Sequence, residues 1–321
     1  MPVAAYAVAS DTGRRRRRNE DNYVVAPPLF AVADGMGGAQ AGEVASRLAA
    51  SALEGSDSDS RPGLERLDAL IQEANRRIYD RASTDPAASG MGTTMTVALV
   101  EGMTVAIGHV GDSRAYLVRG ERMEQLTEDH SLVNELMKSG KLSEEEALVH
   151  PQRSVITRAV GTDPDVDVDA FTIEGEENDV FLLCSDGLTD MVEDEEILEL
   201  VHTHRDDLDK AVKALVAAAN RGGGEDNITA VAFRISADTG PNLEDTVAMP
   251  ALTGDETEPD EETREYVEDP RADTIVVPPD GIPAELAVPE PVADSRRVRL
   301  VLLGLFLLAL VAALLIWGLS R

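Results

Sequence analysis

Acidic residues recur in this 321-residue chain at the ends of apolar runs that have the pattern of core strands. The positions are Asp34 after FAVA, Asp186 after VFLLCS, Asp112 after VAIGHVG, Asp226 before NITAV, and Glu20 with Asp21 before NYVV. A single aspartate at a strand end usually serves a turn, because its side chain bonds to the backbone that follows. The recurrence points instead to a shared role.

Convergence of these carboxylates would require a counter-charge. Like charges a few Å apart do not all remain ionised, and a hard divalent cation removes the conflict. Oxygen ligands without a Cys or His cluster favour Mg²⁺ or Mn²⁺ over Zn²⁺. Asp34 could bridge two ions through its two oxygens, and Gly35, which lacks a side chain, could offer its backbone carbonyl as a further ligand.

The elements that must position these acids are predicted from periodicity. Short strand-like runs, TTMTVALV, MTVAIGHV, RAYLVRG and RMEQL, are separated by the turns EGM and RGER and predict consecutive antiparallel strands. Residues 179–184 and 227–235 read as central, doubly covered strands. Because the strands cluster and are not each followed by a helix, the fold class is α+β.

Three apolar stripes with helical spacing predict helices, and SEEE at 143–146 predicts a short helix that opens with a capping box. The stripes are Val44 with Leu48, then Leu64, Leu67, Ile71, Ala74 and Ile78, and finally Leu208, Val212, Leu215 and Ala219, with a stop at Asn220 before RGGG.

Composition and pattern divide the chain into three parts: a globular domain over residues 1–237, a linker over 238–295, and an anchor over 300–319. With 60 acidic and 29 basic residues the net charge is −31, which excludes a general nucleic-acid binder. Between Pro241 and Asp294 there are 16 acidic residues and two arginines, a net of −14, together with many prolines. This composition is typical of a disordered linker.

The run from Leu300 to Leu319 contains no charged residue and would span about 30 Å as a helix, the thickness of a bilayer core. A buried core helix of this length would normally show a polar face. RRVR directly precedes the run, and basic residues favour the cytoplasmic side. We therefore expect a single-pass, tail-anchored protein of the cell membrane whose globular domain is cytoplasmic.

Eight motifs occur in the order found in bacterial metal-dependent protein phosphatases, the PPM or protein phosphatase 2C family, which residues 5–236 resemble. They are RRRNEDNY, VADGMGG, GTT, GHVGDSRAYL, LTEDHS, ITRAVG, LLCSDGLTD and EDNIT. The resemblance implies two antiparallel β-sheets packed as a sandwich, with helices on both sides and a binuclear metal site at one end. A transmembrane helix would follow the linker.

The resemblance also implies the roles of the site residues. Asp34 would bridge two Mn²⁺ or Mg²⁺ ions, with the Gly35 carbonyl on one ion, and Asp186 and Asp226 on the other. Glu20 would bind a metal directly or through water, and Asp112 would hold a third, weaker ion. Asp21 would orient the water between the metals, Arg16 would grip the substrate phosphate, and residues 131–153 would form a flap.

The implied reaction is hydrolysis of phosphoserine and phosphothreonine in proteins by direct attack of a metal-bridging hydroxide. Some relatives have His after the DG pair as a candidate general acid, but Met36 stands there in this chain. The proton donor is therefore open, with a metal-bound water as the default. A cysteine phosphatase would require an Arg shortly after its nucleophilic Cys, and Cys184 is followed by none. We therefore interpret Cys184 as a buried core thiol.

The expected partners are phosphorylated proteins, above all transmembrane Ser/Thr kinases and their substrates, which share the membrane surface. Thr246 and Thr274 lie between acids and apolar residues, where a phosphothreonine-binding domain could read them after phosphorylation. The alternative to the enzyme is a non-catalytic, membrane-anchored adaptor that binds phosphoproteins. Loss of metal ligands would favour the adaptor, and none of the implied ligands is missing.

Overall fold

The computed structural model describes residues 3–37, 41–53, 61–237 and 275–276. One five-stranded antiparallel sheet within these residues has its strands in the order β1 (Val3–Asp11), β12 (Ile228–Ile235), β11 (Val180–Cys184), β7 (Arg114–Arg119) and β8 (Arg122–Gln125). The central strands β11 and β12 are buried almost throughout, as predicted for doubly covered strands.

The second antiparallel sheet has the order β10 (Asp169–Glu174), β6 (Thr104–Val110), β5 (Met95–Glu101), β3 (Leu29–Met36) and β2 (Asp21–Ala26), with β4 (Gly92–Thr93) paired to β3. A separate parallel pair joins β9 (Val155–Ile156) to β13 (Ile275–Val276).

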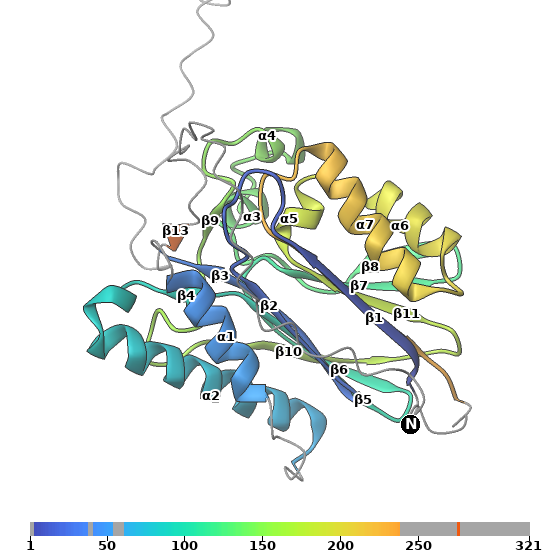
Figure 1. Ribbon diagram of the computed structural model, residues 1–321, viewed down its shortest axis with the longest axis horizontal. Coiled ribbons are helices and arrows are strands. Elements are labelled where there is room, and N and C mark those ends of the chain that lie inside the picture. Colours follow the sequence, from blue (N-terminus) through green and yellow to red (C-terminus); the bar gives the residue numbers. More distant parts are fainter. Residues whose placement is uncertain (1–2, 38–40, 54–60, 238–274, 277–321) are drawn as a thin grey trace, which may run out of the picture. The chain divides into compact units, whose positions relative to one another are not determined.

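Helices cover the outer faces of both sheets (Figure 1). The β3–β5–β6 face is covered by α1 (Ala41–Leu53) and α2 (Gly63–Thr84), and a 3₁₀ turn, η2 (Pro86–Ala88), follows α2. The other sheet is covered by α5 (Asp186–Thr189), α6 (Asp194–Thr203) and α7 (Leu208–Gly222). Two further helices, α3 (Leu132–Lys138) and α4 (Glu144–Leu148), lie in the predicted flap segment.

The apolar core between the two sheets is built from their facing strands. Phe30 of β3 stacks on Phe233 of β12 with ring centroids 4.3 Å apart, and Phe233 stacks on Phe181 of β11 at 5.2 Å. Separate cores lie under α1 and α2 and under α5 to α7. The predicted α+β fold with two sandwiched antiparallel sheets and helices on both sides is therefore confirmed.

One prediction about strand order is wrong. The runs that form β5, β6, β7 and β8 are consecutive in sequence, but β6 lies in one sheet and β7 in the other. The chain changes sheets at Gly111, which adopts a φ of 111°. A Cβ there would come within 2.6 Å of the Thr94 Cβ, so glycine allows both the turn and the close approach.

Leu64 lies within α2, as its place in the predicted stripe implies, and is 36% exposed. One helix boundary needed a small correction. The last helix runs two residues past Asn220, because the first positive φ after it occurs at Gly223, at 148°. The capping box at Ser143 and Glu146 is confirmed.

The predicted anchor, residues 300–319, lies outside the described residues, as does the predicted linker except for Ile275 and Val276. Those two residues form a strand, which the prediction of a structureless linker did not include. Among the described residues, no helix has the length and apolar character needed to cross a membrane.

Candidate active site

Two of the predicted acids face each other across neighbouring strands at one end of the sandwich. Asp34 in β3 is directly opposite Asp21 at the start of β2, so their side chains lie on the same face of the sheet. The Gly35 backbone N–H donates to the Glu20 carbonyl at 3.2 Å, which holds Glu20 beside this pair. Hairpin geometry thus brings together two acidic segments that lie about a dozen residues apart.

The glycines after Asp34 allow the loop to pack against helix α1. A Cβ on Gly35 would lie 2.1 Å from the Gly42 carbonyl oxygen. A Cβ on Gly42 would lie 2.6 Å from the Gly35 carbonyl oxygen and 2.7 Å from Glu20 Oε2. The Gly35 carbonyl and the Glu20 carboxylate, both predicted ligands, therefore border one small space that only glycine leaves open.

The GTT motif fixes the backbone of Asp34. The Thr94 N–H and the Thr93 hydroxyl both donate to the Asp34 carbonyl, at 2.8 and 2.7 Å. In return, the Asp34 N–H donates to Thr94 Oγ1 at 3.0 Å. These bonds hold the main chain of Asp34, whose carboxylate interacts with the other aspartates of the cluster.

The second sheet contributes Asp186 and supports Asp21. Asp186 follows β11 and is the first residue of α5. The preceding residue, Ser185, donates its hydroxyl to Asp21 Oδ2 at 2.8 Å. The same hydroxyl accepts the Thr229 N–H at 2.9 Å, so Ser185 links β2 of one sheet to β12 of the other.

Asn227, buried at the start of β12, organises the arginine-rich loop. Its amide nitrogen donates to the carbonyls of Thr12 and Arg18 at 2.9 and 2.8 Å, and its amide oxygen accepts the Glu20 N–H at 2.7 Å. One side chain therefore holds both ends of the loop that carries Arg16.

Arg16 points from this loop to the acidic cluster, where its Nη2 donates to Asp226 Oδ2 at 2.8 Å. Burial alone would lower the pKa of Arg16, but the charges of Asp226, Asp34 and Asp186 outweigh it and raise the pKa. Neighbouring arginines contact acids outside the cluster: Arg15 pairs with Glu225 at 3.7 Å and Arg18 with Glu43 at 3.8 Å.

Asp112 lies at the crossover from β6 to β7, on a turn held by two buried histidines. The Gly111 N–H donates to His130 Nδ1 at 3.0 Å, and His130 contacts the ring of His109, with centroids 4.8 Å apart. His109 in turn is bonded to Thr96 Oγ1 at 2.9 Å. Both histidines therefore have a structural role.

The electrostatics of the site show mutual crowding of the acids. Burial raises the pKa of Asp34 well above its usual range, and the carboxylates of Asp21, Asp186, Asp226 and Asp112 add to the shift. Burial, with Asp112 and Asp226, does the same to Asp186. Burial also raises the pKa of Asp21 to about 6 and, together with Asp129 and Asp190, that of Asp112 to about 7.

The donor set suits hard divalent cations. Asp21 Oδ1 and Asp186 Oδ1 are buried without a hydrogen-bond partner. An unsatisfied buried carboxylate oxygen is costly unless a cation neutralises it. In the part of the chain that the structure describes, no three His, Cys, Asp or Glu side chains already stand close enough to enclose a metal ion. The oxygen-only chemistry, the orphaned oxygens and the raised pKa values nevertheless fit Mg²⁺ or Mn²⁺.

The sequence-predicted residues thus come from both sheets and meet at one end of the sandwich: Arg16, Glu20, Asp21, Asp34, Gly35, Asp112, Asp186 and Asp226. Sequence patterns predicted no role for Asn227, Ser185 or the GTT threonines, although all lie in the quoted motifs. The pattern that could have identified them is a polar residue directly beside a predicted ligand at the end of a buried strand.

Two other residues of the motifs have structural roles. Met36 is buried against Ile156 and Ala159, so the residue at the position of the candidate general acid packs in a small apolar cluster. Cys184 is fully buried in β11, and burial raises the pKa of its thiol to about 12. The interpretation of Cys184 as a core thiol is confirmed.

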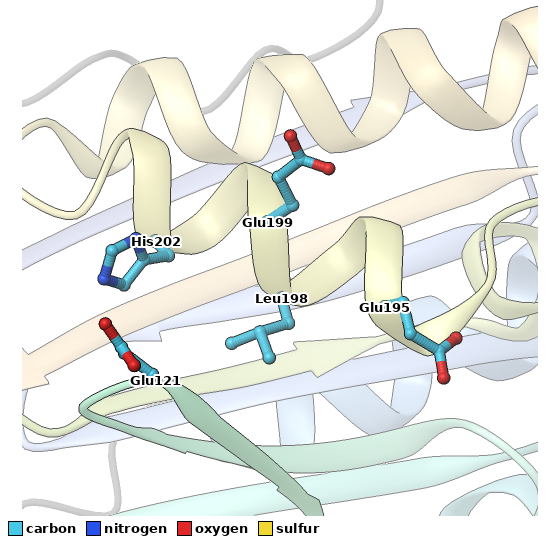
Figure 2. A pocket seen from close by; sticks show the side chains of 5 residues that line it. All are labelled: Glu121, Glu195, Leu198, Glu199 and His202. Carbon is cyan, nitrogen blue, oxygen red and sulfur yellow. The ribbon is translucent and has the colours of Figure 1, made fainter.

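An open pocket of about 260 Å³ lies elsewhere, between α6 and the turn that joins β7 to β8 (Figure 2). Its lining residues are Glu121, Glu195, Leu198, Glu199 and His202. None of them belongs to the acidic cluster, and the volume is below the usual range for ligand pockets. This pocket is therefore not the candidate active site.

Comparisons with known proteins agree with this geometry. Residues 15–224 match the family model described as protein phosphatase 2C. The serine/threonine phosphatase stp of Listeria innocua is 42% identical over 231 residues, which cover 68% of this chain and 91% of that protein.

Solved structures similar to this chain are also serine/threonine phosphatases. The Mycobacterium tuberculosis serine/threonine phosphatase PstP/Ppp superposes with a TM-score of 0.69 at 41% identity, over 72% of this chain and 98% of that one. The PstP catalytic domain in complex with two manganese ions superposes with a TM-score of 0.67 at 39% identity, over the same shares. Each is a protein to which this chain is similar in fold.

The carboxylate cluster at one end of the two sheets, taken together with these matches, indicates a metal-dependent phosphohydrolase. The chain belongs to the protein phosphatase 2C family. It is a serine/threonine protein phosphatase of the metal-dependent type.

Proposed function

We propose that the chain is a membrane-tethered phosphatase that removes phosphate from phosphoserine and phosphothreonine at a site for two Mn²⁺ or Mg²⁺ ions. The main support for this proposal is the carboxylate cluster, in which Asp34 interacts electrostatically with four other aspartates. The proposed ligands are Asp34, the Gly35 carbonyl, Glu20, Asp186 and Asp226, with Asp112 holding a third, weaker ion. The adaptor alternative has no comparable support, because no proposed ligand is lost.

The two ions, when bound, supply a nucleophile at neutral pH and positive charge for the phosphate. The chain's own residues position the substrate and manage protons. Arg16 enters the cluster from the mouth of the site, where a guanidinium can bind two phosphate oxygens at once. Asp21 Oδ1, buried and without a hydrogen-bond partner, can accept a hydrogen bond from the attacking water.

The proposed partners are phosphorylated proteins, in particular transmembrane Ser/Thr kinases and their substrates. The support is the apolar run at 300–319, which would keep enzyme and kinase on one membrane. Thr246 and Thr274, if phosphorylated, would offer sites for a phosphothreonine-binding domain.

The ligand assignment is tested by counting ions. Titration calorimetry of the EDTA-treated full chain in detergent should show two tightly bound Mn²⁺ ions. The Asp186→Asn variant should retain one at most, because the second ion loses an anionic ligand and affinity falls by about a hundredfold or more. Asp165→Asn, which removes an exposed carboxylate, is the matched control and should bind two. Two tight ions in Asp186→Asn would remove Asp186 from the ligand set.

Membrane tethering is tested by removing residues 300–321. The intact chain should sediment with membranes, since a 20-residue apolar helix inserts stably. The shortened chain should move to the soluble fraction with unchanged activity on a phosphothreonine peptide. Sedimentation of the shortened chain with membranes would contradict the tail anchor and would leave the phosphatase assignment intact.

A further inference from the structure

Strand β9 has two edges, and each is paired with a different part of the chain. On one edge, Ile156 bridges Ser131, and the Thr157 N–H donates to the His130 carbonyl at 2.8 Å. On the other edge, β13 runs parallel to β9, with Ile275 opposite Val155 and Val276 opposite Ile156 (Figure 1). Backbone N–H groups alternate between the edges of a strand. Because the Thr157 N–H faces His130, that of Ile156 faces β13.

The position of β9 links this pairing to the active site. Ile156 is fully buried against Met36, which lies two residues after Asp34. Arg153, two residues before Val155, ends the flap and pairs with Asp190 at 3.6 Å and Glu225 at 3.8 Å. Strand β9 therefore forms the base of the predicted flap, residues 131–153, and packs against the loop that follows Asp34.

The segment that pairs with β9 carries a strand signal within an acidic, proline-rich sequence. It reads Asp-Thr-Ile-Val-Val-Pro at residues 273–278, and β-branched residues favour strands while proline ends them. A similar sequence, Asp-Thr-Val-Ala-Met-Pro, occurs at residues 245–250. A chain of roughly 40 residues separates β12 from β13 and could reach up to about 130 Å when extended, so its length permits the pairing.

We propose that the second edge of β9 is a docking site for the chain's own acidic stretch, with Ile275 and Val276 adding to it as a parallel strand. Strand addition uses backbone hydrogen bonds and needs few side-chain contacts. Because the segment is tethered to the same chain, its effective concentration is in the millimolar range, which compensates for a short pairing. The docked segment fastens the acidic stretch to the base of the flap.

Docking gives the Thr274 stretch two competing partners. A phosphothreonine-binding domain that took hold of this stretch would have to remove it from β9, and so would release the base of the flap. Release of the flap by this route rests on the proposed phosphothreonine-binding partner, whereas the docking of the segment on β9 does not. The experiment below tests docking without phosphorylation, metal or substrate.

The test is amide hydrogen exchange at Ile156 in the full chain. Replacing Ile275 and Val276 together with proline removes two backbone donors and should speed exchange at Ile156 by about tenfold or more. The same double change at Val247 and Ala248 is the matched control and should leave the rate unchanged. An unaltered melting temperature in both variants would show that the core remains folded.

A peptide of residues 271–280, added in excess to the Ile275→Pro, Val276→Pro variant, should slow exchange at Ile156 again, and a scrambled peptide should not. Equal exchange rates in the intact chain and this variant would overturn the proposal. Equal acceleration in the control variant would also overturn it, because docking would then not belong to segment 273–278.

Discussion

Replacing Asp34 with asparagine should lower kcat/KM for a phosphothreonine peptide on the order of a thousandfold while the fold remains intact. Asp34 is the acid that interacts with all the other aspartates of the cluster, so its loss removes the ligand shared by both proposed ions. Asparagine has nearly the same shape, and the backbone bonds to Thr93 and Thr94 need no carboxylate. Activity at saturating Mn²⁺, with Asp165→Asn as the control, provides the measurement.

The same variant should be more stable than the parent chain when both are free of metal. The raised pKa of Asp34 means that the folded chain holds this proton more tightly than the unfolded chain, so ionisation opposes folding. This destabilisation begins above the ordinary pKa of 3.8 and grows until the pH passes the folded value. Asparagine removes this destabilisation. We therefore expect the melting temperature to rise by about 3 °C near pH 8, and by less at pH 5.

Thermal unfolding in EDTA at the two pH values measures this difference. Manganese should reverse the order, stabilising the parent chain more than the variant. If the metal-free variant melts below the parent at both pH values, the acids are not crowded in solution and the cluster is wrongly described.

Replacing Asn227 with alanine should reduce kcat/KM by about a hundredfold and the free energy of unfolding by about 3 kcal/mol. The side chain makes three hydrogen bonds to the backbone of residues 12–20, and alanine leaves those buried groups unsatisfied. The loop that aims Arg16 and supports Glu20 then loses its anchor. KM should rise as well as kcat fall, because Arg16 is proposed to bind the phosphate.

Asn75 provides a matched control for this prediction. It is also buried and makes three hydrogen bonds to backbone groups, but it holds residues 161–164. Asn75→Ala should lose similar stability and keep its activity once compared at temperatures where both variants are folded. Chemical denaturation and steady-state kinetics separate the two effects. Equal activity losses would mean that Asn227 matters only for folding.

Sequence patterns predicted most of the fold because hydrophobic periodicity reports burial directly. The buried stripe of α2 and the central strands β11 and β12 follow from it. Periodicity does not reveal which sheet a strand joins, so the change of sheet at Gly111 was missed. That turn depends on contact with Thr94, which lies between β4 and β5, well before Gly111 in the chain.

The acids of the site were predictable because charged residues at strand ends stand out against apolar runs. Their supports were not, since Asn227 and Ser185 act through bonds to segments some 160 to 215 residues away in sequence. The pairing of β13 with β9 was missed for the same reason. Its two residues lie in a stretch whose composition favours disorder, and only the partner strand reveals a structure.

The acidic cluster draws its members from both halves of the sandwich. Asp21 and Asp34 belong to one sheet, whereas Asp186 and Asp226 flank strands of the other. The proposed ions, bound by Asp34 from one sheet and by Asp186 and Asp226 from the other, would join the two sheets in addition to the apolar core and the Ser185–Asp21 hydrogen bond. A shift of one sheet relative to the other would separate these ligands, so metal affinity and activity should report how well the two sheets are aligned.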